Sequence, residues 1–240
     1  MNPEAWEALL YDWHNEHRLR NQRSDIAYWH GLTEPHDRIL VLGAGTGRVA
    51  APLADRAGRR VTALDLSPER LARMPRGPGL LPVCGDMRRL PLTTRQDAVV
   101  IPYSAFQLLP TAGDRERTLT EAARVLEPGG SVHIDVSGSF DTRAESDWRL
   151  SLAEPCPALD GGRVEEWERL RPKSDHVLID KVFRTGSKVL ARVTERWAHL
   201  GALGLEAALD RAGFELAGVD RGYGAGVSPH RTIYHGRRSG

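Results

Sequence analysis

One segment of the chain combines residues that could bind a nucleotide-containing ligand. The apolar run Arg38–Leu42 leads into the turn Gly43-Ala44-Gly45-Thr46-Gly47, and a helical pattern begins at Arg48. A glycine-rich turn between a strand and a helix lets a ligand approach the backbone closely. The dinucleotide-binding pattern needs a third glycine three residues after Gly45, where this chain has Arg48. The alternate spacing of the glycines therefore disfavours a nicotinamide dinucleotide.

Two aspartates follow the next two predicted strands. Asp65 ends the predicted strand Arg60–Asp65, about 20 residues after Gly45, where a carboxylate can accept hydrogen bonds from both ribose hydroxyls. Asp86 follows Leu80–Cys84, where an aspartate can accept from an adenine amino group. Either residue alone could be an ordinary surface or turn aspartate. Their order after the glycine turn favours a nucleoside site.

The elements that position these residues alternate between strand and helix. A helical pattern covers Arg48–Ala57, a second helix opens with Ser67 as its N-cap and Pro68 at its first position, and a third covers Asp114–Leu126. The predicted strands are Arg38–Leu42, Arg60–Asp65, Leu80–Cys84, Asp97–Tyr103 and Ser131–Val136. Such alternation predicts a mostly parallel sheet with helices on both faces.

The two ends of the chain follow other patterns. Residues 3–30 read as helical, with a second helix from Glu16 to Trp29. Residues 138–160 are rich in turn residues. Strand-like alternation predicts a small inserted antiparallel sheet from Arg163–Arg171, His176–Arg184 and Lys188–His199. The chain then returns to a helix, Ala202–Arg211, and two strands, Phe214–Asp220 and Arg231–His235, the first of which is expected to be parallel.

Composition excludes several classes of protein. The chain has 240 residues, 33 basic and 32 acidic side chains and a formal net charge of +1, which does not indicate a nucleic-acid partner. No run of about 18 apolar residues predicts a membrane span, and the N-terminus does not resemble a signal peptide. The two cysteines, Cys84 and Cys156, lack metal-ligand spacing, which fits a reducing cytoplasm. We therefore expect one cytoplasmic domain.

The combined motifs resemble those of class I S-adenosylmethionine (SAM)-dependent methyltransferases. The resemblance covers nearly the whole chain, and Tyr11-Asp12 with Tyr103–Leu108 is similar to a bacterial subgroup that acts on small molecules of natural-product pathways. Its motifs are Val41-Leu42-Gly43-Ala44-Gly45-Thr46-Gly47-Arg48, Val61-Thr62-Ala63-Leu64-Asp65-Leu66-Ser67-Pro68, Gly85-Asp86-Met87-Arg88 and Leu126-Glu127-Pro128-Gly129-Gly130.

The resemblance implies a fold and a cofactor. The fold is an α/β Rossmann-like, seven-stranded, mostly parallel sheet, and SAM is the implied cofactor. Within one methyltransferase domain spanning 1–240, we expect an N-terminal helical lid (1–30), a cofactor-binding half (31–137), a β insertion that covers the substrate (138–200), and a final helix and β hairpin (201–240). The predicted cofactor-binding residues are Tyr11, Arg23, Gly43, Ala44, Gly45, Gly47, Asp65, Leu66, Asp86, Met87 and Pro102.

One position departs from the family pattern. The family usually has an acidic residue two positions before the first glycine, and this chain has Val41. In the family that carboxylate helps organise the methionine end of the cofactor. Either a backbone carbonyl or another side chain takes over this contact, or the cofactor differs, or valine simply suits a buried strand.

Aromatic and polar residues outside the cofactor-binding half are candidates for contacts with the acceptor. All six tryptophans lie outside residues 31–147, and an aromatic cover would exclude water and bind an apolar or ring-containing molecule. Ordinary packing or a dimer contact would explain them equally well. The predicted substrate residues are Trp13, Trp29, Tyr103, Phe106, Gln107, Tyr223 and His230. The segment Ile101-Pro102-Tyr103-Ser104 offers no carboxylate, so no metal is expected.

The reaction implied is displacement at a sulfonium methyl group. Alignment supplies much of such catalysis, and an amine or hydroxyl acceptor also benefits from a base. His14 and His17 are the predicted bases, with Tyr11 near the reactive end of the cofactor by resemblance. We therefore expect a monomer or homodimer that transfers a methyl group to N or O of a small-molecule acceptor in specialised metabolism. The alternatives are a non-methylating use of SAM, such as cyclisation or rearrangement, and a non-catalytic SAM-binding partner.

Overall fold

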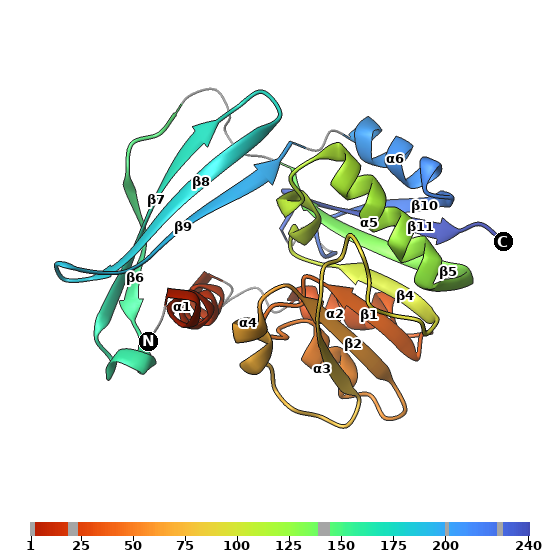
Figure 1. The fold of residues 1–240 in the computed structure, drawn as a ribbon, viewed down its shortest axis with the longest axis horizontal. Helices are drawn as coiled ribbons and strands as arrows, with labels where there is room; N and C mark the ends of the chain where they lie inside the picture. The colour runs from red at the N-terminus through yellow and green to blue at the C-terminus, as the bar shows by residue number, and fades with distance from the viewer. Residues whose placement is uncertain (1–2, 19–23, 139–144, 200–201, 225–227) are drawn as a thin grey trace. The chain divides into compact units, whose positions relative to one another are not determined.

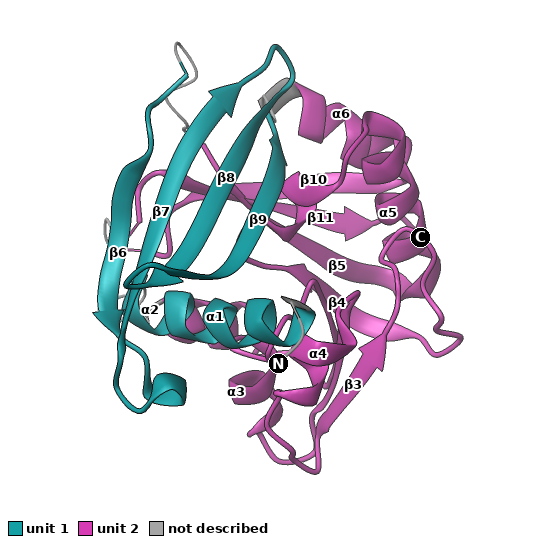
Figure 2. Cartoon of the chain, turned by 60° about the vertical axis from the view of Figure 1, so that its left-hand side comes forward, with its two compact units in different colours: residues 1–22, 140–199 teal, residues 23–139, 200–240 magenta. Residues whose placement is uncertain are grey.

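The computed structural model describes residues 3–18, 24–138, 145–199, 202–224 and 228–240 (Figure 1). Contacts within the chain define two compact units, which Figure 2 shows in different colours. The first unit contains residues 1–22 and 140–199, and the second contains 23–139 and 200–240. Helix α2 (Ser24–Leu32), expected as part of the N-terminal lid, belongs to the second unit. The predicted division into lid, cofactor-binding half and cover stays a prediction.

The second unit is built on a seven-stranded sheet with the order β10-β11-β5-β4-β1-β2-β3. Strands β1 to β5 are parallel to one another, and β11 is antiparallel to both β5 and β10. This confirms the mostly parallel sheet and the parallel direction of β10. The strands are β1 (Arg38–Leu42), β2 (Arg60–Asp65), β3 (Leu80–Cys84), β4 (Gln96–Ile101), β5 (Leu126–Ser137), β10 (Phe214–Arg221) and β11 (Arg231–Arg238).

Helices cover both faces of this sheet, as the sequence predicts (Figure 1). Alternate strand residues point to opposite faces, so Leu40 packs in one core cluster and Val41 in the other. The first cluster includes residues of α5 (Ala112–Val125) and α6 (Ala202–Arg211). The second cluster includes residues of α2, α3 (Ala50–Ala54) and α4 (Pro68–Ala72).

The order of the strands places a crevice at a defined position. Strand β1 lies between β2, which follows it, and β4, which is reached by a crossover to the other side. Ligands of open α/β sheets bind outside the carboxyl ends of the strands at such a switch in strand order. The turns that follow β1 and β4 are therefore the segments that a ligand should contact.

The first unit contains α1 (Pro3–Arg18) and an antiparallel sheet with the order β6-β7-β8-β9. Its strands are β6 (Arg149–Pro155), β7 (Arg163–Pro172), β8 (His176–Thr185) and β9 (Lys188–Ala198). The antiparallel insertion is thus present, with β6 as a strand in the segment that we expected to be turns. Helix α1 packs on this sheet through an apolar cluster that joins Leu10 and Trp13 to Val164 and Phe183.

Some predicted boundaries were wrong. Helix α2 begins at Ser24 rather than Glu16, and α3 spans only Ala50–Ala54. The Pro128-Gly129-Gly130 segment, which lies between the predicted helix and the predicted strand Ser131–Val136, is part of β5, where the pairing with β4 is irregular. The N-cap at Ser67 is confirmed, because its side chain accepts a hydrogen bond from the Arg70 amide. None of the helices within the described ranges is long and apolar enough to cross a membrane.

Candidate functional site

The turn after β1 requires glycine for conformation and for space. Gly43, Gly45 and Gly47 have φ angles of 68°, 58° and 90°, which side chains other than that of glycine rarely tolerate. A Cβ atom on Gly43 would lie 2.5 Å from Cβ of Ala105, which follows β4. A Cβ atom on Gly47 would lie 2.6 Å from Cγ of Met74. The glycine spacing therefore allows the β1 turn to lie directly against the turn that follows β4.

Asp65, at the end of β2, is hydrogen-bonded to the glycine turn. Its side chain is buried, its Oδ2 accepts the Gly45 amide at 2.7 Å, and its Oδ1 accepts the Ser67 amide at 3.0 Å. Each carboxylate oxygen can accept a further hydrogen bond, so the capacity that ribose hydroxyls need is retained. Leu66 beside it is 64% exposed, which leaves an apolar surface next to the carboxylate.

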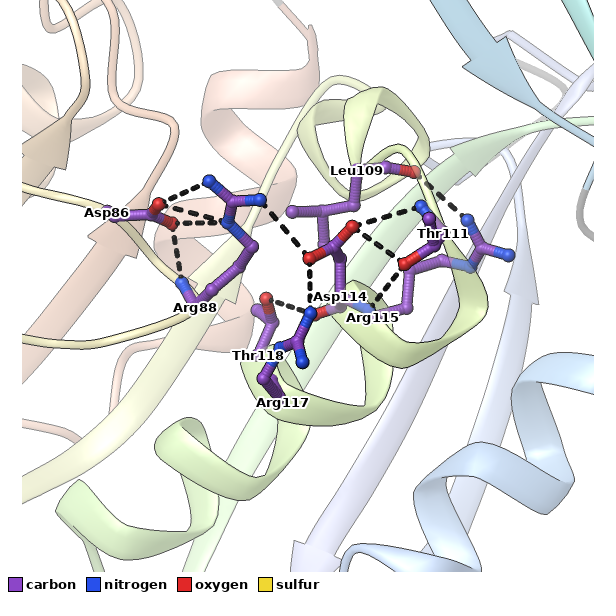
Figure 3. Close-up of polar contacts among 8 residues, drawn as sticks. All are labelled: Asp86, Arg88, Leu109, Thr111, Asp114, Arg115, Arg117 and Thr118. Carbon is purple, nitrogen blue, oxygen red and sulfur yellow. Dashed lines mark hydrogen bonds and ion pairs between the residues drawn. The ribbon is translucent and has the colours of Figure 1, made fainter.

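Asp86, after β3, is part of a chain of charges (Figure 3). The Arg88 guanidinium contacts both of its oxygens, with Nη2 2.6 Å from Oδ2, and also reaches Asp114 at 3.2 Å. The hydrogen bond from Arg88 holds the pKa of Asp86 below its usual range. Asp114 in turn forms a capping box with Thr111 at the start of α5. Asp86 is therefore ionised and anchored, so an adenine amino group would share its oxygens with Arg88.

The turn after β4 has an unusual backbone. Tyr103 and Ser104 have φ angles of 53° and 64°, a conformation that costs of the order of 1–3 kcal/mol for each non-glycine residue. Asp135, near the end of β5, accepts both amides: the Tyr103 N–H binds its Oδ2 at 2.8 Å, and the Ser104 N–H binds its carbonyl at 3.0 Å. Such strained turns are typical of functional sites.

A buried ion pair supports this turn. The Asp135 side chain has no exposed surface, and its Oδ1 accepts Nε of Arg231 at 2.7 Å. Its Oδ2 also accepts the Tyr223 hydroxyl at 2.6 Å, and Nη2 of Arg231 donates to Oγ of Ser104 at 2.8 Å. Burial and the neighbouring Asp135 both raise the pKa of Tyr223, so that it remains a hydroxyl donor. Burial alone would lower the pKa of Arg231, but Asp135 raises it overall.

The Tyr103 ring connects the two turns. The guanidinium carbon of Arg231 lies 4.8 Å from the ring centroid, and that of Arg48 lies 5.2 Å from it. Arg48 directly follows Gly47 and pairs with the buried Asp25 of α2 at 2.7 Å. Cation–π contacts of this kind contribute about 0.5–2 kcal/mol each. The ring of Tyr103 is therefore fixed against the glycine turn.

The structure brings most of the predicted cofactor residues to one edge of the sheet. The glycine turn, Asp65, Asp86, Pro102 and Tyr103 follow the carboxyl ends of β1 to β4. Met87 belongs with them, because its Cε lies 3.6 Å from the Cβ position on Gly43. Arg23 lies outside the described residues. Whether these residues bind the cofactor stays a prediction.

Several residues predicted to contact an acceptor are buried in the second unit. Trp29 has no exposed surface and Phe106 only 1%, since both pack in the core. The Gln107 side chain accepts the Ser137 amide at 2.7 Å, which ties the 3-10 turn η1 (Ala105–Leu108) to β5. Packing explains these three side chains in this structure. Tyr223 is 8% exposed and donates its hydroxyl to Asp135, and His230 is exposed before β11.

The other predicted residues lie in the first unit. Tyr11, Trp13, His14 and His17 all belong to α1. Trp13 is 3% exposed and donates from Nε1 to the Pro155 carbonyl at 3.0 Å, while Nδ1 of His17 lies 2.7 Å from the Trp13 carbonyl oxygen. Nδ1 of His14 lies 2.6 Å from Oε2 of Glu166, a residue of β7. Helix α1 and β7 together therefore form a histidine–carboxylate pair.

Sequence reasoning missed two carboxylates. Asp135 had a usable signal, because an acidic residue near the end of an apolar strand occupies the same kind of position as Asp65. Glu166 had none, since Glu165 and Glu168 surround it in the same strand. Val41 is fully buried in a core cluster. Within the described residues, no group of three or more His, Cys, Asp or Glu side chains is arranged to hold a metal ion.

Comparisons with known proteins agree with this architecture. A family model described as a methyltransferase domain matches residues 39–130. The cypemycin N-terminal methyltransferase of Streptomyces sp is 29% identical over 206 residues, which are 82% of this chain and 81% of that protein. The trans-aconitate 2-methyltransferase of Streptomyces avermitilis is 30% identical over 145 residues, or 58% of this chain and 53% of that protein.

Solved structures share the fold. The sugar N-methyltransferase KedS8 from Streptoalloteichus sp superposes with a TM-score of 0.75 at 21% identity, covering 96% of this chain and 93% of its own. The CcbJ methyltransferase from Streptomyces caelestis superposes with a TM-score of 0.76 at 19% identity, covering 92% and 98%. The sheet order, the glycine turn and the acidic strand ends are those expected of an α/β protein that binds a nucleoside. Residues 39–130 match a methyltransferase domain, and together with the relatives this match supports SAM-dependent methyl transfer, with SAM as the methyl donor.

The contact between Gly43 and Ala105 can be tested by comparing alanine substitutions at Gly43 and at a second glycine. Gly43→Ala should lower the free energy of unfolding by about 2–4 kcal/mol, because it adds a clash with Ala105 to the cost of a positive φ. Gly58→Ala is the matched control: Gly58 also has a positive φ, 82°, but open space around it, so about 1–2 kcal/mol is expected. Urea unfolding of both variants measures the difference. Equal losses would contradict a structural need for close contact at Gly43.

Asp65→Ala should abolish saturable binding of SAM and of its demethylated product in calorimetric titrations. Two lost hydrogen bonds to a carboxylate, at about 1.5–3 kcal/mol each, correspond to at least a hundredfold weaker binding. Asp210→Ala, on the exposed surface of α6, is the control and should bind both as the wild type does. NADH should not bind to either protein. Unchanged affinity in Asp65→Ala would remove this residue from the cofactor site.

The buried pair below Tyr103 should dominate the stability of its turn. Asp135→Asn leaves Arg231 buried without a counter-charge, so we expect a loss of about 3–5 kcal/mol in the free energy of unfolding. Asp97→Asn is the control, because the pair of Asp97 with Arg38 is half-exposed and pairs of that kind contribute about 0–1 kcal/mol. Chemical denaturation of the two variants makes the comparison. Similar losses would show that burial of the Asp135–Arg231 pair is not decisive.

Proposed function

We propose that the protein transfers the methyl group of SAM to a nitrogen or oxygen of a small-molecule acceptor in specialised metabolism. The observation that carries this proposal is the direct contact between the glycine turn and the Tyr103–Ser104 turn, at the carboxyl ends of β1 and β4. The segments predicted to bind the cofactor and to face the acceptor therefore lie in contact with each other. Methyl transfer needs such alignment, since the donor is already activated.

The relatives support a small acceptor and favour nitrogen as the first atom to test. The names of the cypemycin and KedS8 enzymes specify an N-terminus and a sugar nitrogen, whereas that of the trans-aconitate enzyme specifies a small organic acid. A glycopeptide N-methyltransferase, MtfA, also shares the fold, with a TM-score of 0.62 at 22% identity. An amino sugar, a short peptide with a free α-amino group and a tricarboxylic acid therefore form a rational first panel of acceptors.

The residues present fit the cofactor. The glycine turn forms a cradle in which Cβ atoms on Gly43 and Gly47 would collide with neighbours, and the Asp65 carboxylate retains acceptor capacity for ribose hydroxyls. Bound SAM supplies a sulfonium methyl group, and the remaining need is an aligned acceptor that can lose a proton. We assign the proton-accepting role to His14, which is 19% exposed and is held by Glu166. His17 is the weaker candidate, since Nδ1 is bonded within its own helix.

Val41 motivates a second candidate function. A buried valine occupies the position of the usual acidic residue. The loss of that carboxylate favours testing a different use of SAM, such as cyclisation or rearrangement. A non-catalytic SAM-binding protein is the third possibility. The three functions differ in their products.

Methyl transfer predicts demethylated cofactor and methylated acceptor in equal amounts. Incubating the protein with SAM and each member of the panel, followed by mass spectrometry of both products, makes the measurement. The Asp65→Ala variant is the control for cofactor-dependent turnover. Loss of SAM without any methylated acceptor, or tight SAM binding with no turnover on the panel, would contradict the proposed reaction and support one of the other two functions.

A further inference from the structure

We propose that Glu166 is a positioning residue for methyl transfer, which fixes His14 with a proton on Nδ1 and so makes Nε2 the nitrogen that accepts the proton of the acceptor. The proposal rests on the proposed function, and it adds a residue and a tautomer to it. The two residues come from α1 and β7, more than a hundred residues apart in sequence, and both belong to the first compact unit.

The geometry of the pair is that of an oriented base. Nδ1 of His14 lies 2.6 Å from Oε2 of Glu166, a short distance typical of hydrogen bonds to an ionised group. The Glu166 side chain has no exposed surface, whereas 19% of the His14 side chain is exposed. When a carboxylate accepts a hydrogen bond from one nitrogen of a neutral imidazole, that nitrogen carries the proton and the other ring nitrogen can accept one. Histidine–carboxylate pairs with this arrangement serve as bases in several unrelated enzymes.

The surroundings keep Glu166 ionised. Burial alone would raise its pKa, but the bond to His14, followed by the nearby charges of Lys181 and Arg18, holds the pKa below its usual range. Lys181 of β8 binds Glu195 of β9 at 3.1 Å. Two further titratable groups of these elements have their own contacts: the Glu168 carboxylate of β7 lies 3.9 Å from Arg18, and Nδ1 of His17 of α1 lies 2.7 Å from the Trp13 carbonyl oxygen.

A purely structural role explains the pair less well. Helix α1 is already attached to the sheet by apolar contacts of Leu9, Leu10 and Trp13, and by the hydrogen bond from Trp13 to Pro155. A buried ion pair adds little net stability, because desolvation offsets the attraction. Oε1 of Glu166 is also buried, with no hydrogen-bond partner within the described part of the chain. An arrangement that is costly and that orients an imidazole points to a role in chemistry.

The proposed step is balanced. A lone pair on the acceptor nitrogen or oxygen forms a bond to the methyl carbon, and the carbon–sulfur bond breaks with its electron pair going to sulfur. The proton of the acceptor goes to Nε2 of His14, and the positive charge of the imidazolium is stabilised by the Glu166 carboxylate. The proton then leaves to solvent, which restores the neutral imidazole with Nδ1 protonated.

A double-mutant cycle tests the proposal with the amine of the panel that turns over fastest. His14→Ala should lower kcat by about 10²–10⁴-fold, as expected for loss of a positioned base. Glu166→Gln should lower kcat about 10–100-fold, which is part of the loss expected for His14→Ala. It should also shift the acidic limb of the pH profile of kcat to lower pH, because the neutral amide no longer stabilises the imidazolium. Since Glu166 acts only through His14, Glu166→Gln should cause no further loss in the His14→Ala background.

The controls separate positioning from folding. Glu195→Gln removes another ion-paired carboxylate from the same sheet and should leave kcat and its pH profile unchanged. The affinity for SAM and the circular dichroism spectrum should remain unchanged in all variants. Equal fractional losses from Glu166→Gln in both backgrounds, or no loss in the wild-type background, would overturn the proposal.

A measurement without turnover decides the tautomer independently. In ¹H–¹⁵N spectra of the imidazole groups, the wild-type protein should show His14 protonated at Nδ1 above the pH at which the ring becomes neutral. Protonation at Nε2 in the neutral ring would overturn the proposal even if methyl transfer is observed. If no acceptor of the panel is methylated, the proposed function fails, while a spectrum with the Nδ1 proton would still support the assignment of Glu166 as the residue that orients His14.

Discussion

A carboxylate buried in a protein must be surrounded by donors, and Asp135 meets this constraint with groups that shape the site. Its donors are the Tyr103 amide, the Tyr223 hydroxyl and the Arg231 guanidinium. Each bond compensates the lost hydration of the charge, and the first also holds Tyr103 in a left-handed conformation. Because Arg231 packs on the Tyr103 ring as well, the requirement of one buried charge fixes the backbone and the side chain of the turn together.

The same principle recurs at two other carboxylates. Asp65 is buried below the glycine turn, where its donors are the Gly45 and Ser67 amides. Glu166 is buried below α1, where its donor is the His14 ring. In each case an acidic side chain near the end or middle of a strand orders a neighbouring segment that carries functional groups. The three charges therefore organise three different segments: the glycine turn, the turn after β4 and helix α1 at His14.

The sequence predicted the sheet and the turn after β1 because both depend on local patterns. Apolar runs mark buried strands, and the positive φ angles at Gly43, Gly45 and Gly47 require glycine wherever that turn occurs. The positions of Trp29 and the role of Glu166 depend instead on which elements pack together, and spacing along the chain does not encode that. Strand β6 was missed because its pairing with β7, rather than its own residue pattern, stabilises it. Asp135 lies between these cases: its position was visible, but its partners, Tyr223 and Arg231, come from a distant part of the chain.

The residues that the family model matches are those whose structure depends on local sequence patterns. Residues 39–130 contain the glycine turn, Asp65 and Asp86, so the match covers the part whose geometry is set by local residue types. It leaves out α1 and β6 to β9, and thus both His14 and Glu166. A cofactor and an acceptor each constrain the residues that contact them, and these need not lie in the same segment of the chain. The matched segment therefore bears on the methyl donor, and the identity of the acceptor must be sought in residues outside it.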